Sequence, residues 1–387
     1  MAIRQHGETI ADVSRLVGDA VRWPGAVARL RRELPPEMAA AVAELAVGRE
    51  RATRRFGDAD RWWFTRALAE QASHPACAAH RARRFAACAS AADLTCGAGV
   101  DALAMAAAGT RVFAGDRDPL AVTLCRANAS RRAAMVDVAV ADALHPPLRD
   151  LPAVFLDPAR RSGWRRGREQ ESPTLTEAYA LAEGAPGACV KASPALARAE
   201  WPAAAEVELV SVGGELKECV LWFGALRSGA SRRATVLPAD ATLTGAPEAD
   251  GGAGRTPTCP PGRVLYEPDP AVVRAGLVET LAERLGAWKL HPRGALLSAD
   301  AHLATPFART YRVLAAVAWS ARGGRRVREA LAARDAGEVV VKTRGVAVDA
   351  DALARRLRGR GARRLVVLLA HAPEGVRAYV LEPPAEA

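Results

Sequence analysis

Four aspartates each follow a short apolar segment, where a carboxylate can bind or orient a substrate. They are Asp93, Asp116, Asp142 and Asp157. Directly after the first of them, "DLTCGAG" contains the spacing Gly97-x-Gly99, and glycine permits the tight turn and close backbone approach that cofactor-binding loops need. Taken alone, this stretch is also compatible with a nicotinamide or flavin dinucleotide.

The positions of the other acids help to distinguish between these cofactors. A dinucleotide site needs one acid at the end of the second strand, and Asp116 would then bind the ribose hydroxyls. Asp93, however, lies inside the end of the first strand, where it can accept hydrogen bonds from the turn or from a cationic amine. Asp142 closes the third strand and Asp157 begins a D-P turn after the fourth. This set of acids favours a methyltransferase arrangement.

Simpler structural roles stay open for several of these residues. Gly97 and Gly99 could serve only as turn glycines, and Asp142 could cap its own loop. The turn at Asp157 could do no more than end a strand. Asp118 is expected to be a helix N-cap rather than a ligand.

The elements that carry these residues alternate between short β-type runs and helical stretches from residue 89 to 237. Expected strands include "AADLT", "RVFAGD", "VDVAVAD", "AVFLD" and "ACVKAS", with helices over 100–108, 119–131 and 174–183. This alternation is typical of an α/β fold with a doubly wound parallel sheet. The runs "VELVSVGG" and "ELKECVLWFG" are so close that they must form a hairpin, which gives the sheet an antiparallel end.

The rest of the chain suggests three further regions. Residues 1–88 read as a helical N-terminal region whose last two short helices break near Pro75. Residues 238–262 are dense in Gly, Pro and Thr and predict a linker or loop. Residues 263–387 predict a small, separate α+β domain, in which "EVVVKTRG" and "RRLVVLLAH" are strands around a helix at 349–358.

Several motifs together resemble a known family. They are "DLTCGAG", "GDRDP", "DPARR", "VKASP", "GELKE" and "KTRG", with the lead-in "EQAS...RARRF". The chain resembles class I S-adenosylmethionine-dependent methyltransferases with a Rossmann-like sheet, in particular a bacterial subgroup with a C-terminal THUMP-like domain. The resemblance implies S-adenosylmethionine as cofactor. It implies that the amino-acid part lies at Asp93, Cys96, Gly97 and Gly99, the ribose hydroxyls at Asp116, and the adenine at Asp142 and the backbone of Ala143.

The loop after the fourth strand resembles the D/N-P-P-aromatic signature of enzymes that methylate exocyclic amines of bases. It departs from that signature, because "DPAR" lacks the second proline and the aromatic residue. Asp157 can still orient or deprotonate an amine, while stacking on the base would fall to Arg160 or Trp164. Methylation of a pyrimidine carbon would need a nucleophilic cysteine after the fourth or fifth strand, and the sequence has none there.

Lys191 ends the expected fifth strand at the same edge of the sheet. It is one of only four lysines among 54 basic residues, so its presence indicates a point charge or a pKa that arginine cannot supply. The alternative is a surface lysine whose stem covers apolar groups. The candidate catalytic residues are therefore Asp157, Pro158, Arg160 and Lys191.

The basic residues suggest a polyanionic partner. The net charge is +11, and arginines cluster in "RRSGWRRGR", "RGGRRVR" and "RRLRGRGARR". Compositional bias explains why arginine is more frequent than lysine, but it does not explain why basic residues outnumber acidic ones. Because THUMP domains hold RNA for an attached enzyme, the resemblance implies RNA contacts in this domain, with a solvated helix face as the alternative. The candidates are Lys342, Arg344, Arg355, Arg356, Arg358 and Arg360.

Other classes of protein fit the sequence poorly. The seven cysteines are scattered without a C-x-x-C pair, so neither a disulfide framework nor a metal is expected. Apolar runs are shorter than a membrane span, and we expect a cytoplasmic protein. The sequence does not indicate an oligomeric state.

The sequence predicts a methyltransferase that transfers a methyl group from S-adenosylmethionine to structured RNA (tRNA or rRNA), at a base nitrogen. Two alternatives stay open. One is a small-molecule methyltransferase, and the other is an inactive cofactor-binding module that binds RNA.

Overall fold

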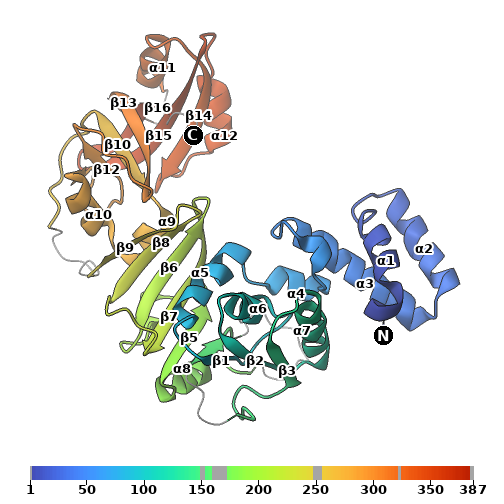
Figure 1. The fold of residues 1–387 in the computed structure, drawn as a ribbon. Coiled ribbons are helices and arrows are strands. Elements are labelled where there is room, and N and C mark those ends of the chain that lie inside the picture. The colour runs from blue at the N-terminus through green and yellow to red at the C-terminus, as the bar shows by residue number, and fades with distance from the viewer. Residues whose placement is uncertain (1, 149–152, 159–171, 247–254, 321–323, 384–387) are drawn as a thin grey trace. The chain divides into compact units, whose positions relative to one another are not determined.

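The computed structural model describes residues 2–148, 153–158, 172–246, 255–320 and 324–383 (Figure 1). The chain divides into two compact units. The first comprises Met1–Val207 with Lys217–Gly229, and the second Glu208–Leu216 with Ala230–Ala387. The second unit thus includes segments that lie before the predicted boundary near residue 238.

The N-terminal region is helical, as predicted. Its helices are α1 (Ala2–Ser14), α2 (Arg22–Glu33), α3 (Pro36–Thr53), α4 (Arg66–Gln71) and α5 (Pro75–Phe85), with the short 3-10 turn η1 (Ala59–Arg61). Thr65 caps α4 by accepting a hydrogen bond from the Leu68 N–H, and Pro75 occupies the first turn of α5, where its missing N–H costs nothing. The predicted break near Pro75 is confirmed.

Among the described residues, the first sheet has nine strands in the order β3-β2-β1-β4-β5-β7-β6-β8-β9. Its first seven in the chain are β1 (Ser90–Asp93), β2 (Arg111–Asp116), β3 (Val136–Val140), β4 (Val154–Leu156), β5 (Gly187–Ala192), β6 (Glu206–Val212) and β7 (Glu215–Gly224). Neighbouring strands from β3 to β5 are parallel, and β7 runs antiparallel to β5. The predicted doubly wound sheet with an antiparallel end is confirmed.

The helices between these strands also match the prediction. They are α6 (Val100–Ala107), α7 (Pro119–Arg131) and α8 (Leu175–Gly184), with the 3-10 turn η2 (Arg198–Glu200). α6 packs on β1 and β2, α7 on β2 and β3, and α8 on β5. Because the strands are parallel, their carboxyl ends meet at one edge, which holds the four aspartates at the strand ends.

The predicted linker at 238–262 contains a strand. β8 (Arg232–Leu237) turns into β9 (Ala241–Gly245), which pairs with it antiparallel. The turn depends on Asp240, whose positive φ of 50° is a conformation that aspartate tolerates better than most residues. The Pro-, Gly- and Thr-rich composition concealed this short strand.

The second sheet has seven strands within the described part of the second unit, in the order β11-β12-β10-β13-β16-β15-β14. They are β10 (Val264–Pro268), β11 (Trp288–Lys289), β12 (Leu297–Ala299), β13 (Ala308–Ala318), β14 (Ala336–Arg344), β15 (Arg363–Ala372) and β16 (Gly375–Glu382). The helices are α9 (Pro270–Ala275), α10 (Val278–Leu285), α11 (Arg325–Ala332) and α12 (Ala350–Leu357). Gly276 adopts a φ of 74° and ends α9, so α9 and α10 are separate helices.

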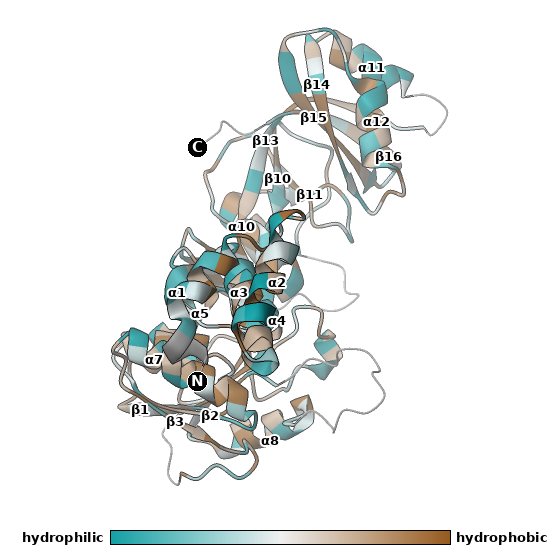
Figure 2. Cartoon of the chain, turned by 90° about the vertical axis from the view of Figure 1, so that its right-hand side faces the viewer, coloured by the Kyte–Doolittle hydropathy of each residue, from teal (hydrophilic) through white to brown (hydrophobic). Residues whose placement is uncertain are grey.

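Strand β14 separates two apolar clusters. Val339 and Val341 belong to a core with Leu353 and Leu357 of α12, and this core also contains residues of α11. Val340 faces the other side, in a cluster with residues of β13, β15 and β16. Figure 2 shows brown strands at β14 and β15 and teal, hydrophilic turns on α11 and α12. Both helices therefore cover one face of this sheet.

None of the described helices combines the length and the apolar character that a membrane span requires.

Candidate functional site

The loop after β1 forms a glycine turn whose backbone requires glycine. Gly97 and Gly99 have φ angles of 52° and 89°, which side chains disfavour. A β-carbon at Gly99 would lie 2.6 Å from the Cys125 sulfur, so this position also requires glycine for space. The Gly97 N–H donates to Asp116 Oδ2 at 2.9 Å, which ties the turn to the end of β2.

Asp93 is fully buried at the end of β1. Its Oδ1 accepts a hydrogen bond from the Thr95 N–H at 3.2 Å, whereas Oδ2 has no hydrogen-bond partner among the described residues. Burial and then the nearby Asp101 charge raise the pKa of Asp93 well above its ordinary value. A buried acceptor beside the glycine turn suits the positively charged amino group of an amino-acid moiety.

Asp116 is partly buried, and desolvation raises its pKa despite hydrogen bonds from backbone N–H groups. Oδ1 accepts from the Asp118 N–H at 2.9 Å. Asp118 itself caps α7 through the Leu120 N–H at 2.8 Å, as predicted. Asp116 therefore shapes the turn and still has lone pairs directed elsewhere.

Asp142 follows β3 at the same edge, since the Ala141 N–H donates to the Asp116 carbonyl at 3.0 Å. Its Oδ1 accepts from the Leu144 N–H at 3.0 Å, so it does cap its own loop. Oδ2 lies 3.8 Å from His145 Nδ1. One carboxylate oxygen thus stabilises the loop, and the other remains available to a ligand beside the buried Ala143.

Cys96 is buried in the turn, and a hydrogen bond with Cys125, followed by desolvation, raises the pKa of its thiol. None of the seven cysteines, all of which lie in the described ranges, is in a disulfide. Within the described ranges, no group of three or more His, Cys, Asp or Glu side chains could hold a metal ion.

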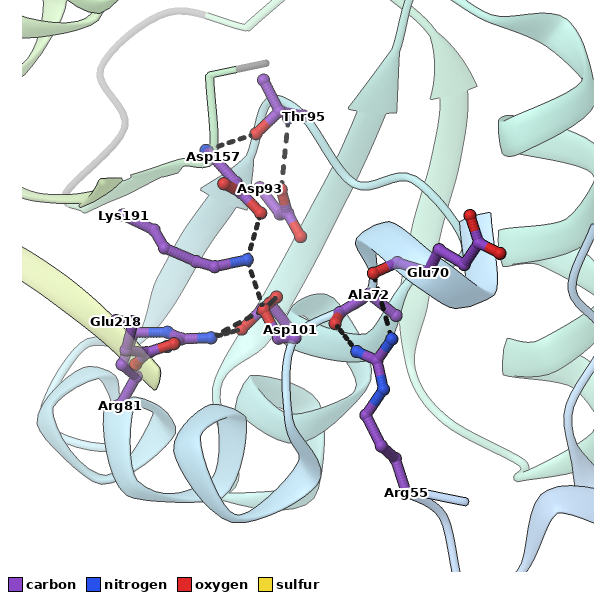
Figure 3. A network of polar contacts seen from close by, with 11 residues as sticks. Arg55, Glu70, Ala72, Arg81, Asp93, Thr95, Asp101, Asp157, Lys191 and Glu218 are labelled. Carbon is purple, nitrogen blue, oxygen red and sulfur yellow. Dashed lines mark hydrogen bonds and ion pairs between the residues drawn. The ribbon is translucent and has the colours of Figure 1, made fainter. Parts of the chain in front are cut away.

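Asp157 follows β4 and lies close to the glycine turn. Its N–H donates to Thr95 Oγ1 at 2.7 Å, and its carboxylate forms an ion pair with Lys191 (Figure 3). The strand register accounts for this pair, because Leu156 lies opposite Val190 in the parallel sheet. Pro158 is buried after it. The predicted stacking residues Arg160 and Trp164 lie outside the described residues.

Lys191 is buried, with only 4% of its surface exposed, so the alternative of a surface lysine is wrong. Its Nζ also donates to Ser73 Oγ at 3.0 Å. Burial alone would lower the pKa of Lys191, but the carboxylates of Asp157 and Asp101 outweigh it and raise the pKa. Lys191 is therefore the cation of a buried ion pair.

Four polar residues that extend this contact network received no role from sequence reasoning. They are Ser73, Arg81, Asp101 and Glu218. Three of them occur in or beside the segments "EQAS", "RARRF" and "GELKE" that carried the family resemblance. Those motifs were the available signal, but their chemistry becomes visible only when the sheet and helices bring them together.

The predicted RNA-binding residues occupy two faces of the second sheet. Lys342 Nζ donates to Glu267 at 2.7 Å and to the Tyr311 hydroxyl at 2.9 Å, and Arg344 pairs with Glu267. They share the face of Val340, opposite α12. The other four, Arg355, Arg356, Arg358 and Arg360, are exposed on or just after α12. The structure therefore does not bring the six residues into one patch.

Known proteins resemble this chain in sequence or in fold. A family described as THUMP domain-like matches residues 308–383. An uncharacterized S-adenosylmethionine-dependent methyltransferase in two strains of Mycobacterium tuberculosis, CDC 1551 and H37Rv, is 34% identical over 368 residues, which cover 88% of this chain and 96% of the relative. A crystal structure described as a methyltransferase from Porphyromonas gingivalis W83 superposes with a TM-score of 0.74 at 20% identity, covering 98% of this chain and 99% of that one.

The structural match shows the shared fold, and the sequence match extends over nearly the whole of the mycobacterial relative. The glycine turn and the unpartnered buried oxygen of Asp93 fit the cofactor that this family uses. The chain belongs to the S-adenosylmethionine-dependent methyltransferases, and it is an enzyme that uses S-adenosylmethionine as its cofactor.

Proposed function

We propose that this methyltransferase acts on structured RNA (tRNA or rRNA) and methylates a base nitrogen. One observation carries the proposal for the acceptor. Asp157 offers a carboxylate with 27% of its side chain exposed, in a loop hydrogen-bonded to the glycine turn. A base amine held by this carboxylate would lie next to the cofactor-binding loop.

The chemistry required of the protein is mainly positioning. When bound, S-adenosylmethionine supplies a methyl group on a positively charged sulfur, which a base nitrogen can attack. Asp157 can accept a hydrogen bond from an exocyclic amine and so orient the nitrogen. It can also accept the proton that this nitrogen must lose after methylation. Asp93, Cys96, Gly97, Gly99, Asp116, Asp142 and Ala143 would hold the cofactor, as the resemblance implies.

Arginines of the second unit support RNA as the partner. A cavity of about 320 Å³ opens where α11 and α12 end, and its lining includes Arg328, Arg358 and Arg360. None of these three side chains has an ion-pair partner within the described part of the chain. Unpaired guanidinium groups around a cavity suit the phosphates of RNA. An enzyme that acts on cellular RNA would work in the cytoplasm.

The decisive experiment combines labelled S-adenosylmethionine with RNA from a strain that lacks the gene, followed by mapping of the labelled nucleotide. Incorporation into one nucleotide is expected. Turnover without RNA would favour a small-molecule methyltransferase. Cofactor binding without any transfer would favour an inactive RNA-binding module.

The same assay tests the role of Asp157. The Asp157→Ala variant should bind S-adenosylmethionine with unchanged affinity, because this side chain faces the acceptor, and should lose about a hundredfold or more in transfer rate. Calorimetry measures the binding and label incorporation the transfer. Full activity of this variant would reduce the loop to a structural turn.

A further inference from the structure

Lys191 is the end of a buried series of polar contacts that starts in the N-terminal helices. The series passes through a triad that consists of Ser73, Arg81 and Asp101. We propose that this triad positions the Lys191 ammonium against one side of the Asp157 carboxylate, so that the exposed side of that carboxylate accepts a hydrogen bond from the methyl acceptor, a neutral N–H donor. The inference rests on the proposed role of Asp157 in RNA methylation.

The Ser73 hydroxyl has a single orientation in this network. It donates to Asp101 Oδ2 at 2.7 Å and accepts from Lys191 Nζ at 3.0 Å and from Arg81 Nη2 at 2.9 Å. A hydroxyl has one proton to donate and two lone pairs, so all its hydrogen-bonding capacity is used. Ser73 therefore fixes the distance between two buried cations that would otherwise repel each other.

The segment that carries Ser73 is itself anchored. Arg55 donates to the carbonyl oxygen of Ala69 at 2.9 Å. It also donates to those of Glu70 at 3.0 Å and Ala72 at 2.8 Å (Figure 3). These carbonyls belong to the last turn of α4, where intrahelical partners are missing. Ser73, which directly follows Ala72, is thus anchored by the helical region in addition to its contact with Lys191 of β5.

Arg81 supplies a permanent charge to the triad. It is 2% exposed and forms ion pairs with Asp101 and Glu218, and its guanidinium lies 5.3 Å from the Phe155 ring centre. Burial lowers its pKa, but the two carboxylates outweigh that and raise it well above the ordinary value. Because Arg81 supplies an ion-pair partner to Asp101, the Lys191 ammonium can form its ion pair with Asp157.

The sum of charges around Lys191 shows what the site can accept. The charged groups that influence Lys191 most are the carboxylates of Asp157, Asp101 and Glu218 and the Arg81 guanidinium. Three negative and two positive charges leave the cluster anionic, with its exposed part at Asp157. An anionic oxygen would be repelled there, whereas a neutral amine can donate an N–H. The geometry thus selects an exocyclic amine over a carboxylate or a deprotonated hydroxyl.

The chain's few lysines allow a test that needs no RNA. Protein labelled with nitrogen-15 lysine gives at most four ammonium signals by NMR, and single Lys→Arg variants assign Lys191 directly or by elimination. Because Lys191 is buried and hydrogen-bonded, its ammonium protons should exchange slowly with water.

Ser73→Ala and Asp101→Asn should speed this exchange. Ser193→Ala, two residues from Lys191 and outside the network, should not. An unchanged Lys191 signal in both Ser73→Ala and Asp101→Asn would overturn the positioning role.

Transfer measurements test the consequence for the reaction. Ser73→Ala should lower kcat by about tenfold or more, because a small displacement of an acceptor group is costly, with the affinity for S-adenosylmethionine unchanged. The wild-type product should carry its methyl group on an exocyclic nitrogen. A methyl group on oxygen or carbon would overturn the substrate assignment. If wild-type enzyme transferred nothing to RNA, the proposed function would fail, and the NMR result would still decide the positioning role.

Discussion

Asp116 illustrates how one carboxylate can shape a turn and bind a ligand. Each carboxylate oxygen accepts one backbone N–H, from Gly97 or Asp118, and each has a second lone pair that can accept a ribose hydroxyl. Charge-assisted hydrogen bonds contribute about 1.5–3 kcal/mol each. Asp116→Ala should therefore weaken S-adenosylmethionine binding by about tenfold or more in calorimetry.

A matched control is available two residues away. Asp118→Ala removes the cap of α7, at a cost of about 1 kcal/mol in stability, and should keep the cofactor affinity. Unchanged affinity in Asp116→Ala, or tight binding of NADH to the wild-type protein, would contradict the role assigned to Asp116.

Asp93 should couple cofactor binding to a proton. In the unfolded chain aspartate titrates near pH 3.9, while burial raises the pKa of Asp93 in the folded protein. Between these two values the folded state holds the additional proton, so the free energy of unfolding should fall as pH rises through that window. A cationic amino group placed against Asp93 favours the carboxylate, so binding should release a proton.

Calorimetry in buffers of different ionisation enthalpy measures this release. Below the raised pKa of Asp93, wild-type protein should release up to about one proton per cofactor bound. Asp93→Asn should release none and should lose the pH dependence of stability over the same window. Equal proton release by the two proteins would show that Asp93 does not contact the amino group.

At the scale of elements, Asn128 of α7 connects the helical region to the cofactor loop. It is fully buried, its Oδ1 accepts from the Trp63 N–H at 2.7 Å, and its Nδ2 donates to the carbonyls of Trp63 at 3.1 Å and Ala98 at 2.9 Å. Asn128→Ala would leave these backbone groups without partners, at about 1–3 kcal/mol for each buried group. The free energy of unfolding in urea should fall by about 2 kcal/mol or more.

The exposed Ser130 on the same helix supplies the comparison. Ser130→Ala should change stability by less than about 0.5 kcal/mol. Equal stability of Asn128→Ala and Ser130→Ala would mean that the helical region docks by apolar contacts alone.

Elements with local signals could be predicted from the sequence, and contacts between distant segments could not. The Asp118-Pro119 pair marks the start of α7 in the chain itself, and the structure begins that helix at Pro119. By contrast, Ser73 and Lys191 are 118 positions apart, and Arg81 and Glu218 are 137 apart. No periodicity predicts such pairs. The strand β9 was missed because its local sequence is misleading, since its composition is that of a loop.

At the scale of the whole molecule, the net charge of +11 matters less than where unpaired arginines lie. Glu267 pairs with both Lys342 and Arg344, so any phosphate on that face must compete with a buried carboxylate. Arg328, Arg358 and Arg360 line a cavity that also contains Asp335, but none of the three forms an ion pair within the described part of the chain. We therefore expect RNA to contact the helical face of the second sheet more strongly than the face of Lys342.

The salt dependence of RNA binding tests this preference. Each phosphate neutralised by an arginine releases counterions, which contributes a slope of about −0.7 in a log-log plot for single-stranded RNA. A variant with glutamine at Arg355, Arg356, Arg358 and Arg360 should therefore bind more weakly, and its slope should be flatter by about 0.7 for each lost contact. Cofactor affinity should not change, because these residues lie in the second unit.

The control variant replaces the same number of exposed arginines on or beside α2 of the first unit. These are Arg22, Arg29, Arg31 and Arg32. Both variants lose the same net charge. If RNA is held only by a general electrostatic attraction, binding should weaken equally in the two variants. If arginines at the end of α12 contact phosphates directly, the slope should become flatter only in the α12 variant. Equal slopes in the α12 variant and the wild type would mean that this arginine cluster is only a solvated helix face. The small-molecule alternative would then gain support, because a small-molecule methyltransferase does not need arginines that bind RNA.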